Sequence, residues 1–244
     1  MINRILVVGG SNGIGLSIVT EIAKQTECEK VYVVDKTPFP IKYANEKIEF
    51  HQFDLTEQDY SIFDRFSDIN ALMITAGFGR LSLFKDIEEK SIIDSFSVNS
   101  IAPIRIVHHF IDRLHRNDDF YCGIMVSIAG FMSSPFFSVY AATKAALKIF
   151  IESVNVELEK NQSTNRIMNV SPGSIKGTSF SSGVTDISLT RTLALEILSH
   201  LEAKDDLFIP MYEEIFKDVL ERYHHDFREE GRHSYEYKLE SGRI

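Results

Sequence analysis

The amino-acid sequence predicts an α/β fold, a doubly wound parallel sheet of about seven strands with helices on both faces. Short β-branched runs alternate along most of the 244 residues with longer segments whose apolar residues recur at helical spacing. Several of the short runs are continuously apolar, as is typical of parallel strands that are buried on both faces. Repeated strand–helix–strand order also implies right-handed crossovers between neighbouring strands.

The elements follow in chain order. The first predicted strand, RILVV, runs through a glycine-rich turn into a helix, and each later apolar run is followed by a segment of helical periodicity or by polar chain. A seventh strand is predicted near Leu207–Pro210. The other predicted strands are Arg4–Val8, Lys30–Val34, Ile48–Phe53, Ala71–Ile74, Tyr121–Ser127 and Arg166–Val170. The predicted helices are Ile14–Gln25, Glu57–Phe66, Ser91–Arg116 and Tyr140–Lys160.

A single domain is expected for residues 1–244, because no repeat, low-complexity segment or linker rich in Pro, Gly or Ser divides the chain. Residues 212–244 are expected to form a helical or irregular extension of this domain. The stretch from Ser171 to Ser188 is rich in Ser, Gly and Thr. It is interpreted either as a mobile flap or as a plain surface connection.

Composition and charge argue against several classes of protein. The formal net charge of -9 is unlike the basic surfaces that track nucleic-acid phosphates. Cys28 and Cys122 lack any CxxC or His-paired spacing, so neither a disulfide framework nor a zinc site is expected. The pairs His108–His109 and His224–His225 are poor chelates, since adjacent helical residues point about 100° apart. No signal sequence and no run of about 20 apolar residues is recognised, so a cytoplasmic protein without membrane or nucleic-acid partners is expected.

A glycine-rich turn, Gly9-Gly10-Ser11-Asn12-Gly13-Ile14-Gly15, follows the first strand and opens a helix. Glycine is needed where the chain turns sharply and a pyrophosphate must approach the backbone closely. The helix N-terminus then offers unpaired N–H groups and a partial positive charge to the phosphates. This order is that of a Rossmann-type dinucleotide site. The predicted cofactor contacts here are Gly9, Ser11, Asn12, Gly13, Ile14 and Gly15.

Two acidic residues stand where the second and third strands end. Asp35 follows Gly15 by about 20 residues, where a carboxylate accepts hydrogen bonds from the adenosine ribose and repels a 2′-phosphate. NAD(H) is therefore favoured, and NADP(H) stays open because Lys36 lies next to that carboxylate. Asp54 and the adjoining Leu55 are predicted to reach the adenine edge, with a helix N-cap as the alternative for Asp54.

A serine, a tyrosine and a lysine indicate the chemistry. Ser127 ends the fifth strand, and Tyr140 and Lys144 open the following helix. Residues i and i+4 share a helix face, so the Lys144 ammonium can lie beside the Tyr140 phenol and favour the phenolate. A tyrosine of ordinary pKa, ~10, is a poor base at neutral pH, so a neighbouring cation and a positive nicotinamide ring are required. Ser127 would donate a hydrogen bond to a carbonyl oxygen.

From Ile2 to about Pro210 the chain resembles the short-chain dehydrogenase/reductase family in its compact form. The resemblance implies that the glycine turn binds the cofactor and that Ser127, Tyr140 and Lys144 are catalytic, with the last two also contacting the cofactor. It implies that Asn99 holds a water in the proton relay. Ala76 and Gly77 match the end of the family's Asn-Asn-Ala-Gly segment, but both asparagines are replaced.

The family's Pro-Gly after the sixth strand matches Pro172-Gly173, whose nearby backbone is implied to meet the nicotinamide amide. The threonine usual five residues after that proline is shifted, because Gly177 occupies its place and Thr178 follows. Ile175 and Thr178 are retained as predicted cofactor contacts. The seventh strand lacks the family's glycine-rich ending.

The sequence thus predicts an NAD(H)-dependent oxidoreductase that interconverts a secondary alcohol and a ketone or related carbonyl, with Tyr140 as general acid/base. An NAD-binding regulatory protein of the same fold with little turnover is the alternative. Phe131, Phe136 and Phe137 are predicted to form an apolar wall of the substrate pocket, with ordinary loop packing as the other interpretation.

A homodimer or homotetramer is expected. The extension has apolar residues at helical spacing, which predicts packing on its own subunit or, alternatively, closure of a partner's active site. These residues are Ile215, Phe216, Val219, Leu220 and Tyr223. For the stretch beyond Gly231 the sequence allows two alternatives: it orders over a neighbouring subunit, or it remains loose.

Overall fold

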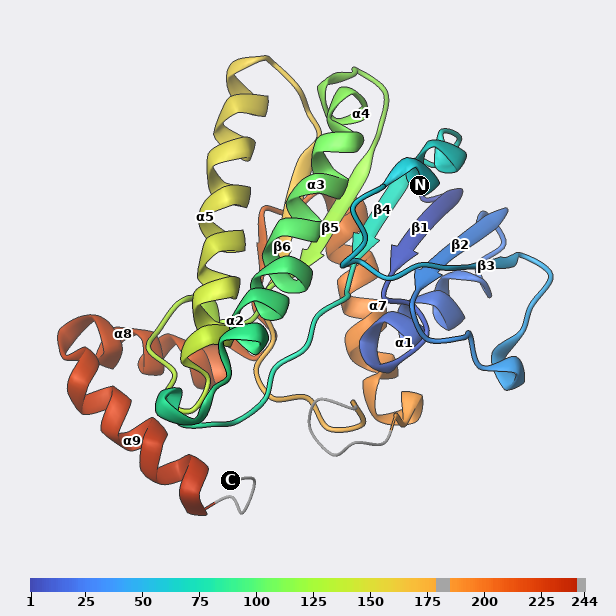
Figure 1. The fold of residues 1–244 in the computed structure, drawn as a ribbon. Helices are drawn as coiled ribbons and strands as arrows, with labels where there is room; N and C mark the ends of the chain where they lie inside the picture. The colour runs from blue at the N-terminus through green and yellow to red at the C-terminus, as the bar shows by residue number, and fades with distance from the viewer. Residues whose placement is uncertain (179–184, 241–244) are drawn as a thin grey trace.

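The computed structural model describes residues 1–178 and 185–240, and it confirms the predicted fold class (Figure 1). The described strands form one sheet in the order β3-β2-β1-β4-β5-β6-β7, and every neighbouring pair is parallel. The strands are β1 Arg4–Val8, β2 Lys30–Asp35, β3 Ile48–Gln52, β4 Ala71–Ile74, β5 Tyr121–Met125, β6 Arg166–Val170 and β7 Leu207–Phe208.

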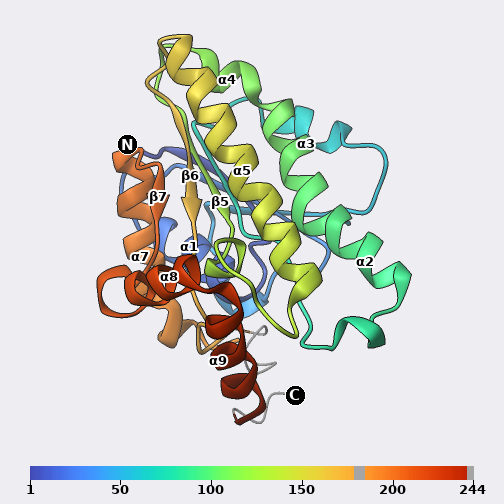
Figure 2. The same ribbon diagram turned by 90° about the vertical axis from the view of Figure 1, so that its left-hand side faces the viewer.

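Helices cover both faces of the sheet (Figures 1 and 2). On one face, α1 and α7 bury Ile18 and Ile197 against the sheet, and on the other α3 and α5 bury Ile106 and Leu147. The α-helices are α1 Gly13–Ile22, α2 Glu89–Phe96, α3 Ala102–His109, α4 Ile111–His115, α5 Ser138–Lys160, α7 Ile187–Ala203, α8 Lys217–His225 and α9 Phe227–Glu240. The 3₁₀ helices are η1 Ile41–Tyr43, η2 Ser61–Phe66, η3 Phe84–Asp86 and η5 Ile128–Gly130, and the π-helical turns are η4 Ser97–Ile101 and η6 Tyr212–Phe216.

The strand order reverses between β1 and β4. Because β1 pairs with β2 on one side and β4 on the other, the carboxyl ends of β1 and β4 border a crevice, where doubly wound sheets bind their ligands. The N–H groups of Thr75 and Ala76 donate to Val8 O at 2.8 and 3.0 Å. These hydrogen bonds hold the floor of the crevice together.

The predicted helix Glu57–Phe66 is wrong over its first half, which is not helical. Only its second half is helical, as the 3₁₀ helix η2. Asp54 Oδ1 accepts the Thr56 N–H and Asp59 Oδ1 accepts the Ser61 N–H, both at 2.9 Å. Such local side-chain to backbone hydrogen bonds compete with the helical ladder. The predicted helix Ser91–Arg116 is also divided, into α2, η4, α3 and α4.

Helix α7 was not predicted from the sequence, although its signals are present. Asp186 accepts the Ser188 N–H at 3.0 Å as an N-cap, and Leu193, Ile197 and Leu201 are buried at helical spacing. The serine-rich composition upstream obscured this start. Residues 179–184 of the proposed flap lie outside the described part of the chain.

The C-terminal extension folds into η6, α8 and α9, which pack on their own subunit (Figure 2). Leu220 of α8 is buried with Ile128 and Ile209, and Phe131, Met132 and Phe216 pack against them. This cluster joins the extension to the chain that follows Ser127. Among the described residues, no helix is long and apolar enough to cross a membrane.

Candidate active site

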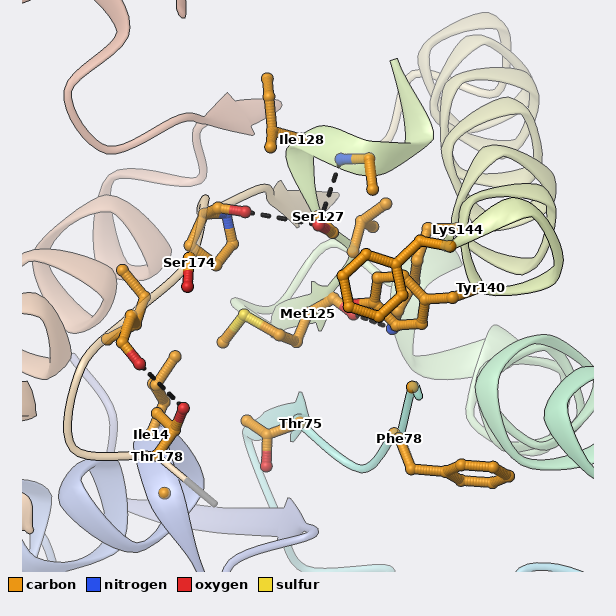
Figure 3. Close-up of a pocket in the computed structure, with 18 of the residues that line it drawn as sticks. Ile14, Thr75, Phe78, Met125, Ser127, Ile128, Tyr140, Lys144, Ser174 and Thr178 are labelled. Carbon is orange, nitrogen blue, oxygen red and sulfur yellow. Dashed lines mark hydrogen bonds between the residues drawn. The ribbon is translucent and has the colours of Figure 1, made fainter. Parts of the chain in front are cut away.

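A cavity of about 1930 Å³ lies at the carboxyl ends of the central strands (Figure 3). Four groups of residues line it: the glycine turn with the ends of β2 and β3, the segments that follow β4, β5 and β6, residues of α2, η4 and α5, and the C-terminal extension. Within one cavity, the structure therefore joins the predicted nucleotide end to the predicted chemical end.

The glycine turn lies against the chain that follows β4. Gly9 has φ 89°, and a Cβ there would come within 2.5 Å of the Ala76 backbone nitrogen. A Cβ on Gly15 would come within 2.2 Å of Gly9 O and 2.4 Å of Thr75 Oγ1. Gly13 has φ 51° and open space around it, with Thr178 3.7 Å from its Cβ position. Only glycine allows this approach, which leaves a bare backbone cradle facing the cavity.

Thr75, which replaces an asparagine of the family pattern, has a definite structural role. Its hydroxyl lies 3.1 Å from Val8 O and 3.0 Å from Gly9 O, so it donates to the carbonyls at the start of the glycine turn. Asn12 and Ile14 line the cavity beside this turn.

Asp35 is held at the mouth of the nucleotide end. Its carboxylate accepts the Ser11 N–H at 3.0 Å and the Thr37 N–H at 2.9 Å. The Ser11 hydroxyl oxygen is buried and has no hydrogen-bond partner among the described residues. Ser11, a predicted cofactor contact, does not itself line the cavity. The glycine cradle and the oriented carboxylate of Asp35 do line it, and they fit the phosphates and ribose of a dinucleotide.

Asp54 and Leu55 both line the cavity, as predicted for an adenine-contacting pair. The Asp54 carboxylate is also committed to a local turn, since the Thr56 N–H and Oγ1 lie 2.9 Å from its Oδ1. The Thr56 backbone hydrogen bond is the largest favourable cause that lowers the pKa of Asp54, with a smaller contribution from Lys36. Asp54 therefore caps the turn, and Leu55 is buried beside it.

Ser127, Tyr140 and Lys144 come together in the middle of the cavity (Figure 3). The Ser127 hydroxyl accepts the Ala129 N–H at 3.1 Å and donates to Pro172 O at 3.4 Å. Lys144 Nζ donates to Met125 O at 2.8 Å and lies 5.7 Å from the centre of the Tyr140 ring. Strand β5 ends at Met125, two residues before the predicted end, and Ser127 is the N-cap of η5. The start of η5 and the first two turns of α5 thus position all three groups.

Burial shifts the pKa of both titratable groups. Lys144 is only 2% exposed, and loss of hydration lowers the pKa of its ammonium to about 7. Burial raises the pKa of the Tyr140 phenol to about 12, and the hydrogen bond with Ser127 opposes that rise. Desolvation thus favours the neutral form of each group, which differs from the charged lysine and lowered phenol pKa that the spacing predicted.

Asn99 lies in the π-helical turn η4, a distortion that is frequent at functional sites. Its fully buried side chain accepts the Phe78 N–H at 2.9 Å and donates to Phe78 O at 2.8 Å and Thr143 Oγ1 at 3.2 Å. A Cβ on Gly77 would lie 3.3 Å from both Asn99 Oδ1 and Lys144 Nζ. The amide of Asn99 therefore fixes the segment after β4 next to the lysine.

The predicted contacts after β6 also line the cavity. They are Pro172, Gly173, Ile175 and Thr178, together with Ser174, which the sequence analysis missed. The Thr178 hydroxyl donates to Ile175 O at 2.9 Å and so closes this turn. Phe216 of η6 packs over Gly173, because a Cβ there would come within 2.5 Å of Phe216 Cζ.

The three predicted substrate-wall aromatics have different surroundings. Phe137 lines the cavity, and its ring centre lies 5.3 Å from that of Tyr140. Phe131 packs in the cluster beneath α8, and Phe136 is buried against Tyr235 of α9, with ring centres 4.5 Å apart. Neither of these two is among the residues that line the cavity.

The C-terminal extension supplies one wall of this cavity, which the sequence did not predict. Apolar side chains come from η6 and α8, and mostly polar ones from the end of α8 and from α9. These are Ile215, Phe216, Val219, Arg222, Glu230, His233, Ser234, Tyr237 and Lys238. The helical spacing of 215–223 was visible in the sequence, but no local signal indicates which pocket that face would meet.

Known proteins resemble this chain in sequence and in fold. A family profile described as "short chain dehydrogenase" matches residues 3–186. "Dehydrogenase RED2" of Cochliobolus heterostrophus is 28% identical over 170 residues, which are 67% of this chain and 63% of that protein, so the match spans less than two thirds of the relative. "Sorbitol-6-phosphate 2-dehydrogenase" of Klebsiella pneumoniae is 27% identical over 80% of this chain and 78% of that protein. A solved short chain dehydrogenase from Burkholderia cenocepacia, titled as a complex with NADP, covers 89% of this chain and 92% of its own, with 21% identity and a TM-score of 0.73.

Proposed function

The chain belongs to the short-chain dehydrogenase family, and from this premise we propose that it is an NAD(H)-dependent oxidoreductase that interconverts a secondary alcohol and a ketone. One observation carries the proposal. Ser127, Tyr140 and Lys144 converge in a cavity whose other end is the glycine cradle with Asp35. A proton-transferring phenol and a dinucleotide site in one continuous space are what hydride transfer to or from a carbinol carbon requires.

In the proposed oxidation, Tyr140 removes the hydroxyl proton of the alcohol, and in reduction it returns a proton to the carbonyl oxygen. Ser127 donates a hydrogen bond to that oxygen and holds it beside the phenol. When bound, the oxidised cofactor supplies the hydride acceptor and a positive ring that favours the phenolate. The cavity wall here includes the apolar side chains of Met125, Phe137 and Phe216. By excluding water they lower the local dielectric, which strengthens each of these interactions.

Lys144 is proposed to favour the Tyr140 phenolate through its ammonium, whose Nζ lies 5.7 Å from the centre of the Tyr140 ring. Asn99 is buried and does not itself line the cavity, and its amide holds the segment after β4 through Phe78. We propose, as the family pattern implies, that Asn99 also holds a water that carries the proton toward solvent.

The preference for NAD(H) is proposed on the carboxylate of Asp35. Two backbone N–H groups orient this carboxylate at the mouth of the nucleotide end, where it accepts ribose hydroxyls and repels a 2′-phosphate. Lys36 also lines the cavity and would weaken the repulsion. The solved relative titled as an NADP complex is 21% identical, a level at which the likeness concerns the fold and not the choice of cofactor.

The test is a panel of secondary alcohols and ketones, including polyol phosphates, assayed with NAD(H) and NADP(H). We expect turnover with NAD(H), and a Tyr140→Phe variant that still binds NADH but loses about 100-fold or more in kcat. Tyr43→Phe, at a residue that does not line the cavity, is the matched control and should behave as wild type. Equal behaviour of wild type and Tyr140→Phe across the panel would refute the enzyme proposal and favour a cofactor-binding regulatory protein.

A further inference from the structure

Helix α9 contacts the loop between the proposed catalytic serine and tyrosine at successive residues. Ser133 Oγ donates to Phe227 O at 3.4 Å, at the start of α9. Lys238 Nζ donates to Ser134 Oγ at 2.8 Å and to Pro135 O at 2.7 Å, and this lysine is 8% exposed. Helix α9 is therefore hydrogen-bonded to residues 133–135, and at Ser134 and Pro135 the donor is a buried cation.

The next residue of the loop, Phe136, has an unfavourable backbone conformation. Its φ is 65°, in the left-handed region, which is unfavourable for a non-glycine residue. Such a residue persists only when its surroundings hold it. The Tyr235 ring of α9 packs against the Phe136 ring at a tilt of 33°, with ring centres 4.5 Å apart, and the Ser82 N–H donates to Phe136 O at 2.9 Å.

The loop in turn leads directly into α5, the helix that carries Tyr140. Phe137 directly precedes α5, its carbonyl accepts the Ala141 N–H at 2.7 Å, and its ring lies 5.3 Å from the Tyr140 ring. Tyr140 is the third residue of α5. Phe137 therefore links the backbone at Phe136 to the first turn of α5, which carries the phenol.

We propose that Tyr235 and Lys238 of α9 are positioning residues that hold the 133–137 loop and thereby place the phenol of Tyr140. The inference rests on the proposed function and extends it, since it makes the C-terminal helix a part of what sets the catalytic geometry. Tyr235 does not line the cavity; Lys238 does, but in this proposal it acts through the loop and not on substrate. Their effect reaches the reacting atoms through Phe136 and Phe137.

The experiment compares Tyr235→Ala and Lys238→Met with Tyr235→Phe, which keeps the stacking ring, and with Leu239→Ala, an exposed site on the same helix. Amide hydrogen exchange of residues 131–139, NADH binding, and kcat and KM on the best panel substrate are measured. A displacement of about 1 Å at a reacting group can cost up to about 100-fold, so for Tyr235→Ala and Lys238→Met we expect kcat to fall about tenfold or more. KM and NADH affinity should change less than about threefold, and exchange in the loop should accelerate.

Tyr235→Phe and Leu239→Ala should match wild type in every readout. The proposal is overturned if loop exchange is unchanged in Tyr235→Ala, or if exchange accelerates while kcat stays at the wild-type value. Loss of NADH binding together with kcat would also overturn it, since that indicates general unfolding. Exchange is measured without substrate, so an inactive wild type would refute the proposed function while the exchange rates still decide whether α9 holds the loop.

Discussion

The buried lysine of the candidate site predicts a pH dependence of stability that can be measured without knowing the substrate. Lys144 is 2% exposed, and burial lowers its pKa from 10.5 to about 7 in the folded chain. In the unfolded chain the ordinary pKa of 10.5 is restored. Between these two values the unfolded state binds more protons than the folded state, so the free energy of unfolding rises with pH.

The size of the effect follows from the same two values. Each pH unit inside the window contributes about 1.4 kcal/mol, so from pH 7 to pH 9 the contribution of Lys144 to the free energy of unfolding grows by about 2 kcal/mol. The assay is urea denaturation of wild type and Lys144→Met at pH 7, 8 and 9. Methionine has a similar length and no charge, and the other titrating groups cancel in the difference between the two proteins.

Wild type should gain about 2 kcal/mol relative to Lys144→Met over this range. Parallel pH profiles would refute the reasoning, because they would mean that Lys144 keeps an ordinary pKa and is hydrated in the folded chain.

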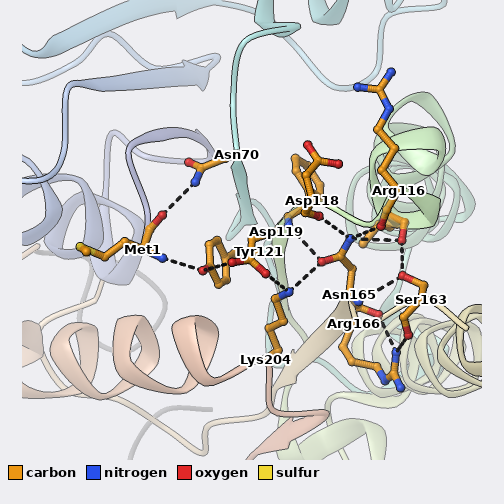
Figure 4. A network of polar contacts seen from close by, with 12 residues as sticks. Met1, Asn70, Arg116, Asp118, Asp119, Tyr121, Ser163, Asn165, Arg166 and Lys204 are labelled. Carbon is orange, nitrogen blue, oxygen red and sulfur yellow. Dashed lines mark hydrogen bonds and ion pairs between the residues drawn. The ribbon is translucent and has the colours of Figure 1, made fainter.

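Further predictions test the cradle, the cofactor choice and the framework. Gly9→Ala should lower the melting temperature far more than Gly13→Ala: both have positive φ, but only at Gly9 does the Cβ meet a backbone atom, 2.5 Å away. In fluorescence titrations Asp35→Ser should weaken NADH binding and tighten NADPH binding at least about tenfold, and NADPH already bound more tightly by wild type would contradict the assignment. Asn165 is fully buried in a polar network at the opposite end of the sheet, where it accepts the Phe120 N–H at 3.0 Å (Figure 4). Asn165→Ala should cost about 3 kcal/mol in urea denaturation while NADH affinity is retained, and a neutral effect would show that this network adds little stability.

The sequence by itself determined the fold class and the family, both of which the structure and the comparisons confirm. Each depends on a local pattern: an apolar run such as Arg4–Val8 reveals a buried parallel strand, and glycines between strand and helix reveal a close approach of the backbone. The pairing of Tyr140 with Lys144 depends on one helical period, so their common location in the cavity was also predictable.

Only the tertiary structure decided which surfaces meet that site. Tyr235 and Lys238 contact residues about a hundred positions earlier in the chain, and no periodicity of either segment encodes that pairing. Burial likewise belongs to the assembled fold, so the desolvation that lowers the pKa of Lys144 and raises that of Tyr140 was not visible in the sequence. Spacing determines which residues share a face, whereas hydration and long-range contact depend on everything packed against that face.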